Sequence, residues 1–411
     1  MGFKNFSLLA AFFFLMNCAG GSATTGNKDT KEEEGYQTPI HVFLEDIMEK
    51  EGVEQLSSIA SEIVYIPLET NDNSLLKDIS HVVCLGNNFV VSDPTNIYLF
   101  DHDGKYIKRV AQQGGGPADF PMAILNVITD PKTDNLFLCV TRKILKFDKN
   151  AKYTGNIQTN EIGSLSRGVY TDNKTMVFGL LNKVWTLGDT TTVFNAIEID
   201  TLGNEINKYV NNSPRYSEVV KMPLNSLVTP VYIFNNDIKF LDWGNDTIFS
   251  VVGGSMIPYA ILDLGKNKAN YNPDLSKIDP LKLNETLESF SGHAIMNVFE
   301  DDIFLFLYLT EKGLSNNEVH CIFNKRTKEL KLLKDNTFSN DLDGGIFFFP
   351  RKVLKDNELI SWVSAEKFIE EILSKDYDAQ KAKYGDRFEK TYQLAKSLHD
   401  DDNPVLIIAK K

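Results

Sequence analysis

No apolar run in this chain of 411 residues reaches the roughly 20 residues that a membrane-spanning helix needs. Cysteine is scarce too, with only four in the whole sequence. Cys84, Cys139 and Cys321 lie in apolar, strand-like runs and lack the close spacing of a zinc site, so we interpret them as buried small hydrophobic residues. A single disulfide pair among them remains open.

Sequence signatures of common hydrolases are also missing. Neither His-Glu-x-x-His nor His-x-His occurs, which argues against a zinc centre, and no Gly-x-Ser-x-Gly turn presents a serine nucleophile. The net charge is −13 without a basic patch, so the surface would repel a phosphate backbone, and we expect no nucleic-acid partner. We interpret the scattered histidines as surface or hairpin residues: His41, His81, His102, His293, His320 and His399.

The amino terminus predicts export. An apolar run, Phe6–Met16, is too short to cross a bilayer but suits the hydrophobic region of a secretory signal. Leu15, three places before Cys18, gives a sequence that resembles the bacterial lipobox. We therefore expect residues 1–17 to be a signal peptide and Cys18 to be the lipid-attachment site. Asn17 departs from the usual Gly, Ala or Ser, so ordinary secretion with loss of Cys18 is the alternative.

Residues 18–38 predict a flexible tether, because they are small, polar and charged and offer almost nothing to bury. We expect an outer-membrane lipoprotein of the cell envelope that contacts the membrane through its N-terminal lipid only. Acidic residues begin at Asp29 rather than directly after the cysteine, so periplasmic and surface-facing orientations both stay open.

A hairpin motif recurs along the chain. In Asn96–Val110, two apolar strands flank an Asp-Gly turn, where Gly takes a positive φ at little cost. Similar hairpins surround Asp148 and Asp200, at intervals of about 50 residues, which is the period of four-stranded propeller blades. A different hairpin signal, Trp243–Phe249, follows at a similar interval, and a weaker copy of the motif spans Cys321–Leu330.

Strand-like runs fill residues 62–364, which at about 50 residues a blade predicts six blades, with five or seven as alternatives. The polar stretch Lys266–Glu288 predicts an insertion between two blades. The fold class is thus all-β, a six-bladed β-propeller with four-stranded antiparallel blades, and residues 39–411 form its domain.

The carboxyl end changes character. Ala365–Ser374 and Asp376–Leu398 predict amphipathic helices, which together span about 365–398. A closing strand at about 404–409 should pair in the same blade as Ile63–Leu68, because closing the ring removes exposed strand edges. The apolar face of the second helix holds Phe388, Tyr392 and Ala395.

These features together resemble the six-bladed β-propeller lipoproteins of Bacteroides-type bacteria, which are related to NHL-repeat propellers. The resemblance covers most of the mature chain and implies the fold and an envelope location, but no catalytic motif. It is carried by the lipobox at Cys18 and by Ile66–Thr70, Gln113–Phe120, Asp246–Phe249, Tyr259–Lys266 and Asp401–Leu406.

The glycine loop Gly114–Pro117 follows a strand, but no helix with Lys-Ser/Thr comes after it. We therefore interpret it as a blade-connecting turn rather than a phosphate cradle. Loops of this kind gather at one face of a propeller and often carry function. Arg109, Gln112, Gln113 and Asp119 are therefore candidate ligand-binding residues.

A second candidate segment is the unusually aromatic stretch 341–351, in which Asp343 and Arg351 are candidate ligand-binding residues. An exposed Phe347 or Phe349 would stack on a sugar or a peptide. Alternation more simply places both rings in a core between blades.

The aspartates at the hairpin turns are interpreted as turn-setting acceptors of backbone N–H bonds: Asp101, Asp103, Asp148, Asp200 and Asp246. No cofactor is expected, although calcium bound by channel-facing carboxylates of several blades is possible. Our leading hypothesis is a non-catalytic binding module for a glycan, a peptide or an envelope protein. The alternatives are a calcium-dependent lactonase, hydrolase or lyase of the six-bladed type, and a propeller whose helices only dock a partner protein.

Overall fold

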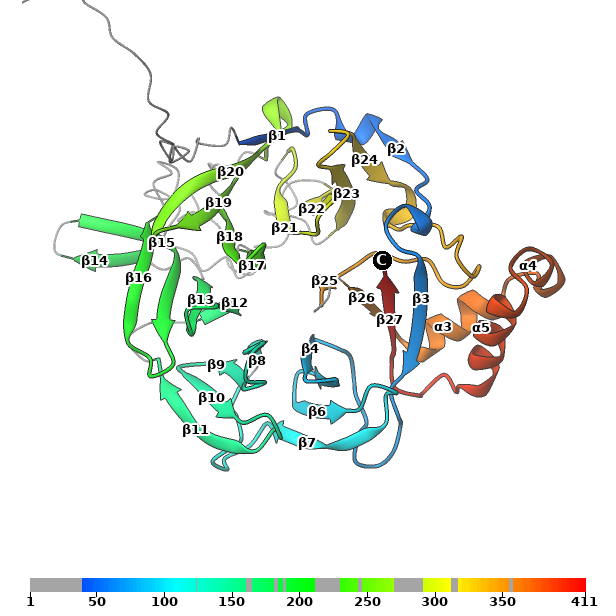
Figure 1. The fold of residues 1–411 in the computed structure, drawn as a ribbon, viewed down its shortest axis with the longest axis horizontal. Coiled ribbons are helices and arrows are strands. Elements are labelled where there is room, and N and C mark those ends of the chain that lie inside the picture. The colour runs from blue at the N-terminus through cyan, green and yellow to red at the C-terminus, as the bar shows by residue number, and fades with distance from the viewer. Residues whose placement is uncertain are drawn as a thin grey trace, which may run out of the picture. The chain divides into compact units, whose positions relative to one another are not determined.

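The computed structural model describes residues 39–122, 124–159, 165–180, 184–187, 190–210, 230–242, 246–269, 291–311, 317–354 and 358–411. All of them belong to one compact unit, residues 38–411. Six sheets stand around a common centre in this unit, so the predicted six-bladed β-propeller is confirmed (Figure 1). The predicted signal peptide, Cys18 and the predicted tether lie outside the described residues.

Each blade begins with its innermost strand. Blade one holds β4 (His81–Leu85), β5 (Asn88–Ser92), β6 (Asn96–Phe100) and β7 (Tyr106–Gln112), and blade two holds β8 (Ile124–Thr129), β9 (Leu136–Val140), β10 (Lys143–Phe147) and β11 (Tyr153–Gln158). Blade three holds β12 (Leu165–Tyr170), β13 (Thr175–Leu180), β15 (Thr190–Asp200) and β16 (Glu205–Val210), with β14 (Val184–Leu187) paired to the start of β15.

The other three blades follow the same plan. Blade four holds β17 (Val231–Phe234), β18 (Asp237–Asp242), β19 (Thr247–Val252) and β20 (Ser255–Asp263), and blade five holds β21 (Ile295–Glu300), β22 (Phe304–Thr310), β23 (Glu318–Asn324) and β24 (Leu330–Leu333). Blade six holds β25 (Lys352–Val353), β26 (Leu359–Val363), β27 (Val405–Lys410) and β3 (Glu62–Pro67). The insertion expected at Lys266–Glu288 lies mostly outside the described residues.

Blade six closes the ring with both ends of the propeller. Its outer strand β3 comes from the amino-terminal side and pairs antiparallel with β27, from Pro67 opposite Val405 to Glu62 opposite Lys410. The predicted pairing of the closing strand with residues near Ile63–Leu68 is therefore confirmed. Because the ring is closed, every blade has a neighbouring blade on both sides.

Two short strands that the sequence did not reveal precede β3. β1 (Ile40–Phe43) runs parallel to the outer strand β20 of blade four, and β2 (Glu51–Gly52) runs parallel to β24 of blade five. They cover strand edges that would otherwise be open to pairing with another chain. Short 3-10 helices lie between them and elsewhere: η1 (Ile47–Glu49), η2 (Leu56–Ser58), η3 (Gly265–Asn267) and η6 (Lys334–Asn336).

Asp101, Asp148 and Asp200 set the outer turns as predicted, whereas Asp103 donates its backbone N–H to Asp101 instead of accepting one. Oδ1 of Asp101 accepts the backbone N–H groups of Asp103 and Lys105, both at 2.9 Å. Asp148 accepts two N–H groups at 2.9 Å, and Asp200 two at 2.8 Å, at the same positions of their turns. These bonds lower the pKa of Asp148, chiefly through the Lys152 N–H, and lower that of Asp200, chiefly through the Asn204 side chain.

Asp246 lies in a different kind of hairpin, the one between β18 and β19. It is buried between β18 and β19, whereas the outer hairpin of blade four turns at Gly253 and Gly254. Their φ values of 58° and 79° explain the difference, because two glycines accept positive φ without an Asp acceptor. Of the signal Trp243–Phe249, residues 243–245 lie outside the described residues.

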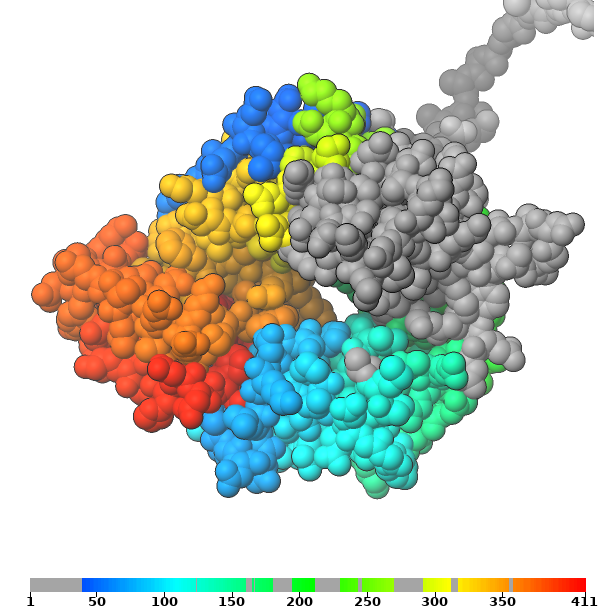
Figure 2. Space-filling view, turned by 180° about the vertical axis from the view of Figure 1, so that it is seen from behind, coloured from blue at the N-terminus to red at the C-terminus, as the bar shows by residue number. Residues whose placement is uncertain are grey.

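The carboxyl-terminal helices are three rather than two: α3 (Ala365–Leu373), α4 (Tyr377–Tyr384) and α5 (Asp386–Ser397). The predicted single helix over 376–398 is broken at Gly385, whose φ of 63° no helix accommodates. Seen from behind, the helices stand out at the rim of the ring (Figure 2). None of the described helices is long and apolar enough to cross a membrane.

The hydrophobic core lies in layers between neighbouring blades. Phe147 and Leu99, for example, share one buried cluster between blades one and two. Cys139 and Cys321 are buried as expected, and burial raises the pKa of both thiols. Cys84 is only half-buried, because it lies on the innermost strand of blade one, and these three cysteines are free thiols.

Candidate functional site

The innermost strands of the six blades, β4, β8, β12, β17, β21 and β25, surround the centre of the ring (Figure 1). Each is the innermost strand of a blade built on the same plan, so all six run in the same direction along the axis. Residues near the start of these strands therefore lie at one mouth of the centre, and the space-filling view shows a hollow at this place beside blade one (Figure 2).

Three innermost strands carry a β-bulge near that mouth. The register shifts between Ile124 and Asn126 on β8, between Leu165 and Gly168 on β12, and between Ile295 and Asn297 on β21. A bulge changes the direction in which a side chain points. Arg167 lies within the bulge of β12, which is how a strand in the middle of the sequence brings a cation to the ring centre.

Side-chain contacts confirm this direction. Nη1 of Arg167 on blade three donates a hydrogen bond to Oδ1 of Asn297 on blade five. Nδ2 of Asn126 on blade two donates to the carbonyl oxygen of Gly168, at 3.1 Å. The bond of Arg167 skips blade four, so its side chain reaches across the centre rather than along the rim.

Two further residues complete what we call the central cluster: His81, Asn126, Arg167, Asn297 and Lys352. Nζ of Lys352, the first residue of β25, lies 3.4 Å from the carbonyl oxygen of Val82 on blade one. Nδ1 of His81, the first residue of β4, lies 3.0 Å from Oγ of Ser92. The cluster thus draws residues from every blade except blade four.

Burial, together with the charges of Lys352 and Arg167, lowers the pKa of His81 to about 4, so the imidazole is neutral at pH 7. Burial also lowers the pKa of Lys352 and of Arg167, and for Arg167 the negative charge of Glu318 opposes this effect. Both cations nevertheless reach solvent.

The central cluster is cationic within an acidic protein. Among the residues that the structure describes, neither Arg167 nor Lys352 lies within ion-pair distance of a carboxylate. The chain as a whole carries a net charge of −13. Calcium prefers several oxygen ligands with negative charge, so this set of side chains does not suit the calcium ion considered from the sequence.

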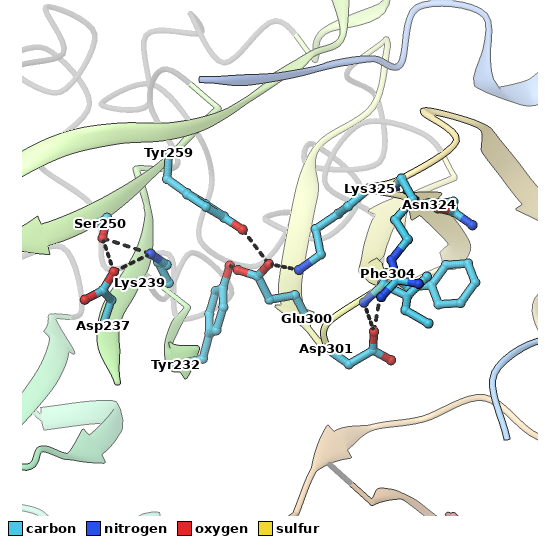
Figure 3. A network of polar contacts seen from close by, with 12 residues as sticks. Tyr232, Asp237, Lys239, Ser250, Tyr259, Glu300, Asp301, Phe304, Asn324 and Lys325 are labelled. Atoms are coloured by element: carbon cyan, nitrogen blue, oxygen red, sulfur yellow. Dashed lines mark hydrogen bonds and ion pairs between the residues drawn. The ribbon is translucent and has the colours of Figure 1, made fainter. Parts of the chain in front are cut away.

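A second polar network lies between blades four and five, and the charges of its own residues compensate one another (Figure 3). The fully buried carboxylate of Glu300 accepts hydrogen bonds from Tyr232 at 3.0 Å, Tyr259 at 2.7 Å and Lys325 at 2.6 Å. Burial and the Glu300 charge raise the pKa of both tyrosines. Every oxygen of Glu300 has a partner, so this network joins the two blades and offers no group to a ligand.

The four candidates near the glycine loop lie away from the central cluster. Arg109 is exposed on the outer strand β7, Gln112 ends this strand, and Gln113 is exposed just beyond it. The carboxylate of Asp119 accepts the N–H of Gly116 at 2.9 Å and so holds the loop closed. The loop joins β7 of blade one to β8 of blade two, which confirms the blade-connecting turn.

Asp343 is buried and has four partners. Tyr65 at 3.1 Å, Asn340 at 2.7 Å and the N–H of Gly345 at 2.8 Å donate to Oδ1, and Thr391 donates to Oδ2 at 2.8 Å. The carboxylate therefore joins strand β3, its own loop and helix α5. A cavity of about 370 Å³ lies beside it and also borders Arg387 and Lys390 of α5.

The aromatic segment around Arg351 does not follow strand alternation. Phe349 is buried, as alternation predicts, but Phe347 is 49% exposed, which corrects the prediction that both rings lie between blades. The segment pairs only through an isolated bridge between Phe338 and Phe348, so no pleat dictates which side its residues face. Arg351 is exposed and its guanidinium lies 4.8 Å from the ring centre of Trp362.

One exposed group of possible metal ligands occurs among the described residues. Oxygen or nitrogen atoms of Asp101, His102 and Asp103 lie within 4.8 Å of one another in the outer hairpin of blade one. Asp101 already accepts two backbone N–H groups there, so the group serves the turn.

A family model described as "Domain of unknown function (DUF4934)" matches residues 39–410. A solved protein of Bacteroides fragilis, named as exported, is similar in structure, with 15% identity, a TM-score of 0.65, and coverage of 91% of this chain and 100% of that one. A member of the duf4221 family from Bacteroides vulgatus has 10% identity and a TM-score of 0.44, covering 66% of this chain and 84% of that one. No curated protein matches the sequence.

Proposed function

Because the chain belongs to the DUF4934 family, which has no assigned activity, we propose a function from the site itself: a non-catalytic binding module of the cell envelope. The ligand is a glycan, a peptide or an envelope protein, and it enters the mouth of the ring with a polar group in contact with the central cluster. The observation that carries this proposal is the bond of Arg167 to Asn297 across the centre, which exposes a cation to solvent inside the ring.

Binding fits the central cluster better than catalysis does. A general base works best when its pKa is close to the working pH, and the pKa of His81, about 4, makes it a weak base at neutral pH. No carboxylate among the described residues pairs with the two cations. The cluster therefore lacks a general acid that is protonated beside a general base that is deprotonated. Two cations without a base are suited to holding a ligand in place.

The cell location is proposed from the amino terminus. The signal peptide over residues 1–17 and the lipobox at Cys18 support an outer-membrane lipoprotein, and the similar protein of Bacteroides fragilis is named as exported. Replacing Cys18→Ala in the full chain should move the protein from the membrane fraction to the soluble fraction. Unchanged fractionation together with an unlipidated wild-type chain, seen by mass spectrometry, would reject the anchor.

The binding function is tested with the chain from residue 19 onward and a panel of soluble glycans and peptides, by calorimetry. Arg167→Gln should abolish binding of any hit, whereas Arg109→Gln, which removes the same charge from an exposed outer strand, should retain it. If Arg109→Gln abolishes binding and Arg167→Gln retains it, the ligand binds at the blade-connecting loop instead. Calcium-dependent hydrolysis of lactones or esters by the same preparation would replace the proposal with the enzymatic alternative.

A further inference from the structure

We propose that the central cluster is an oxyanion site, in which Arg167 holds a carboxylate or phosphate group of the ligand and Lys352 adds positive charge from the opposite part of the ring. This inference deepens the proposed function, on which it rests for its biological meaning, by naming the chemical group that enters the ring. Carboxylate and phosphate share the chemistry that the site recognises, and the experiment below separates the two.

The charge balance is the first argument. Two interior cations elsewhere in the described chain have carboxylate partners: Lys325 pairs with Glu300 at 2.6 Å, and Lys239 pairs with Asp237 at 3.2 Å. The two cations of the central cluster have no such partner among the described residues. Because partial desolvation of a cation is costly unless an opposite charge compensates it, an anion at this place would relieve a cost that the folded protein otherwise bears.

The geometry of the donors is the second argument. Arg167 presents a planar guanidinium with five N–H donors, and the one hydrogen bond it makes among the described residues is that to Asn297. Lys352 comes from the opposite part of the ring, and its bond to Val82 is long, at 3.4 Å. A guanidinium and an ammonium are the two donor types that proteins use to bind carboxylates and phosphates.

His81 forms a neutral wall of the site rather than a ligand. One ring nitrogen faces Ser92, and the ring also bonds to the backbone of Leu125. Both Lys352 and Arg167 act on its protonation, so an anion bound in the central cluster should partly cancel their charges and favour the protonated ring. The imidazole of His81 is therefore a built-in reporter of anion binding.

The experiment uses the chain from residue 19 onward and two probes, inorganic phosphate and glucuronate, in chloride-free buffer. The His81 ring is followed by NMR, assigned by comparison with His81→Gln, and the affinity is measured by titration. We expect the pKa of His81 to rise when one probe binds. Arg167→Gln or Lys352→Gln should weaken that binding at least about tenfold, the effect of one charge-assisted hydrogen bond.

The matched control is Lys149→Gln, which removes one positive charge from an exposed outer turn and should leave the affinity unchanged. Binding of phosphate but not glucuronate, or the reverse, identifies the group. If neither probe binds, or if Lys149→Gln weakens binding as much as the central variants, the oxyanion site is rejected. Should Arg167→Gln fail to fold, as seen by its thermal midpoint, Lys352→Gln alone decides the question.

The two proposals fail in different ways. If a glycan or peptide binds to the wild type and equally well to Lys352→Gln, the binding function stands and the oxyanion site falls. If phosphate or glucuronate binds as expected but no envelope ligand does, the oxyanion site stands and the proposed function falls.

Discussion

Arg167 of blade three is hydrogen-bonded to Asn297 of blade five, although blade four stands between these blades in the ring. In a propeller, neighbouring blades meet through their broad faces, so a side-chain bond between non-neighbours has to pass through the centre. The bond therefore places the guanidinium of Arg167 inside the ring, on the side of blade five.

The protonation of His81 gives the first prediction. Its pKa is about 4 in the folded chain and 6.5 in an unfolded one, because burial and the charges of Lys352 and Arg167 disfavour the cation. The unfolded state therefore binds more protons between these two pH values, and stability falls as the pH is lowered through this window. We expect a loss of about 3 kcal/mol from pH 7 to pH 4 from this group.

Chemical denaturation across the pH range measures this effect. The variant His81→Gln, which cannot take up the proton, should show a flatter dependence between pH 6.5 and pH 4 than the wild type. Identical slopes for the two proteins would mean that His81 is solvated like a surface residue and that the centre of the ring is open.

The buried carboxylate of Glu300 gives the second prediction. Glu300→Ala removes the counter-charge of Lys325, whose side chain is only 10% exposed, and leaves two tyrosine hydroxyls without an acceptor. We expect a loss of about 3 to 5 kcal/mol in the free energy of unfolding. Glu205→Ala, which breaks the more exposed pair with Lys208, should cost less than about 1 kcal/mol.

Closure of the ring gives the third prediction. Ile407 of β27 is 2% exposed and lies between β26 and β3, so Ile407→Ala should destabilise the chain by about 2 to 5 kcal/mol. Leu202 is 75% exposed, and Leu202→Ala should change stability by no more than about 0.5 kcal/mol. Equal effects in thermal unfolding would contradict the role of β27 in holding the chain ends together.

The break between helices α4 and α5 gives the fourth prediction. Gly385 has a φ of 63°, and a Cβ added there would meet no atom within 4 Å, so only backbone strain opposes a side chain. Gly385→Ala should cost about 1 to 3 kcal/mol in the free energy of unfolding. Gly115 has equally open surroundings without a positive φ, so Gly115→Ala is the control and should leave stability nearly unchanged.

Much of the fold was predictable because its signals are local. The turn aspartates Asp101, Asp148 and Asp200 bond to backbone atoms two and four residues ahead, and such contacts are encoded within one short segment. The interval between them predicted the blades. β1 and β2 were missed because short parallel edge strands depend on the outer strands β20 and β24, which come much later in the chain.

The central cluster was not predictable in the same way. Arg167 reaches the centre through a bulge, and its partner Asn297 lies 130 positions away in the sequence. A usable signal did exist, since Arg167 and Lys352 are cations placed in the first strands of blades, where the other residues are mostly apolar. Using it would have required knowing which strand of each repeat is innermost, and the hairpin motif marks only the outer pair.

The path of the amino-terminal segment has a mechanical consequence. The chain first touches the rim of blade four as β1, continues along blade five as β2, and enters the ring only as β3. Tension applied from the amino-terminal side would therefore load two short edge strands before it reached the β3–β27 seam. We expect β1 and β2 to separate from the blade edges first under such tension and to pair again when it is released. The ring and its central cluster should keep their shape meanwhile.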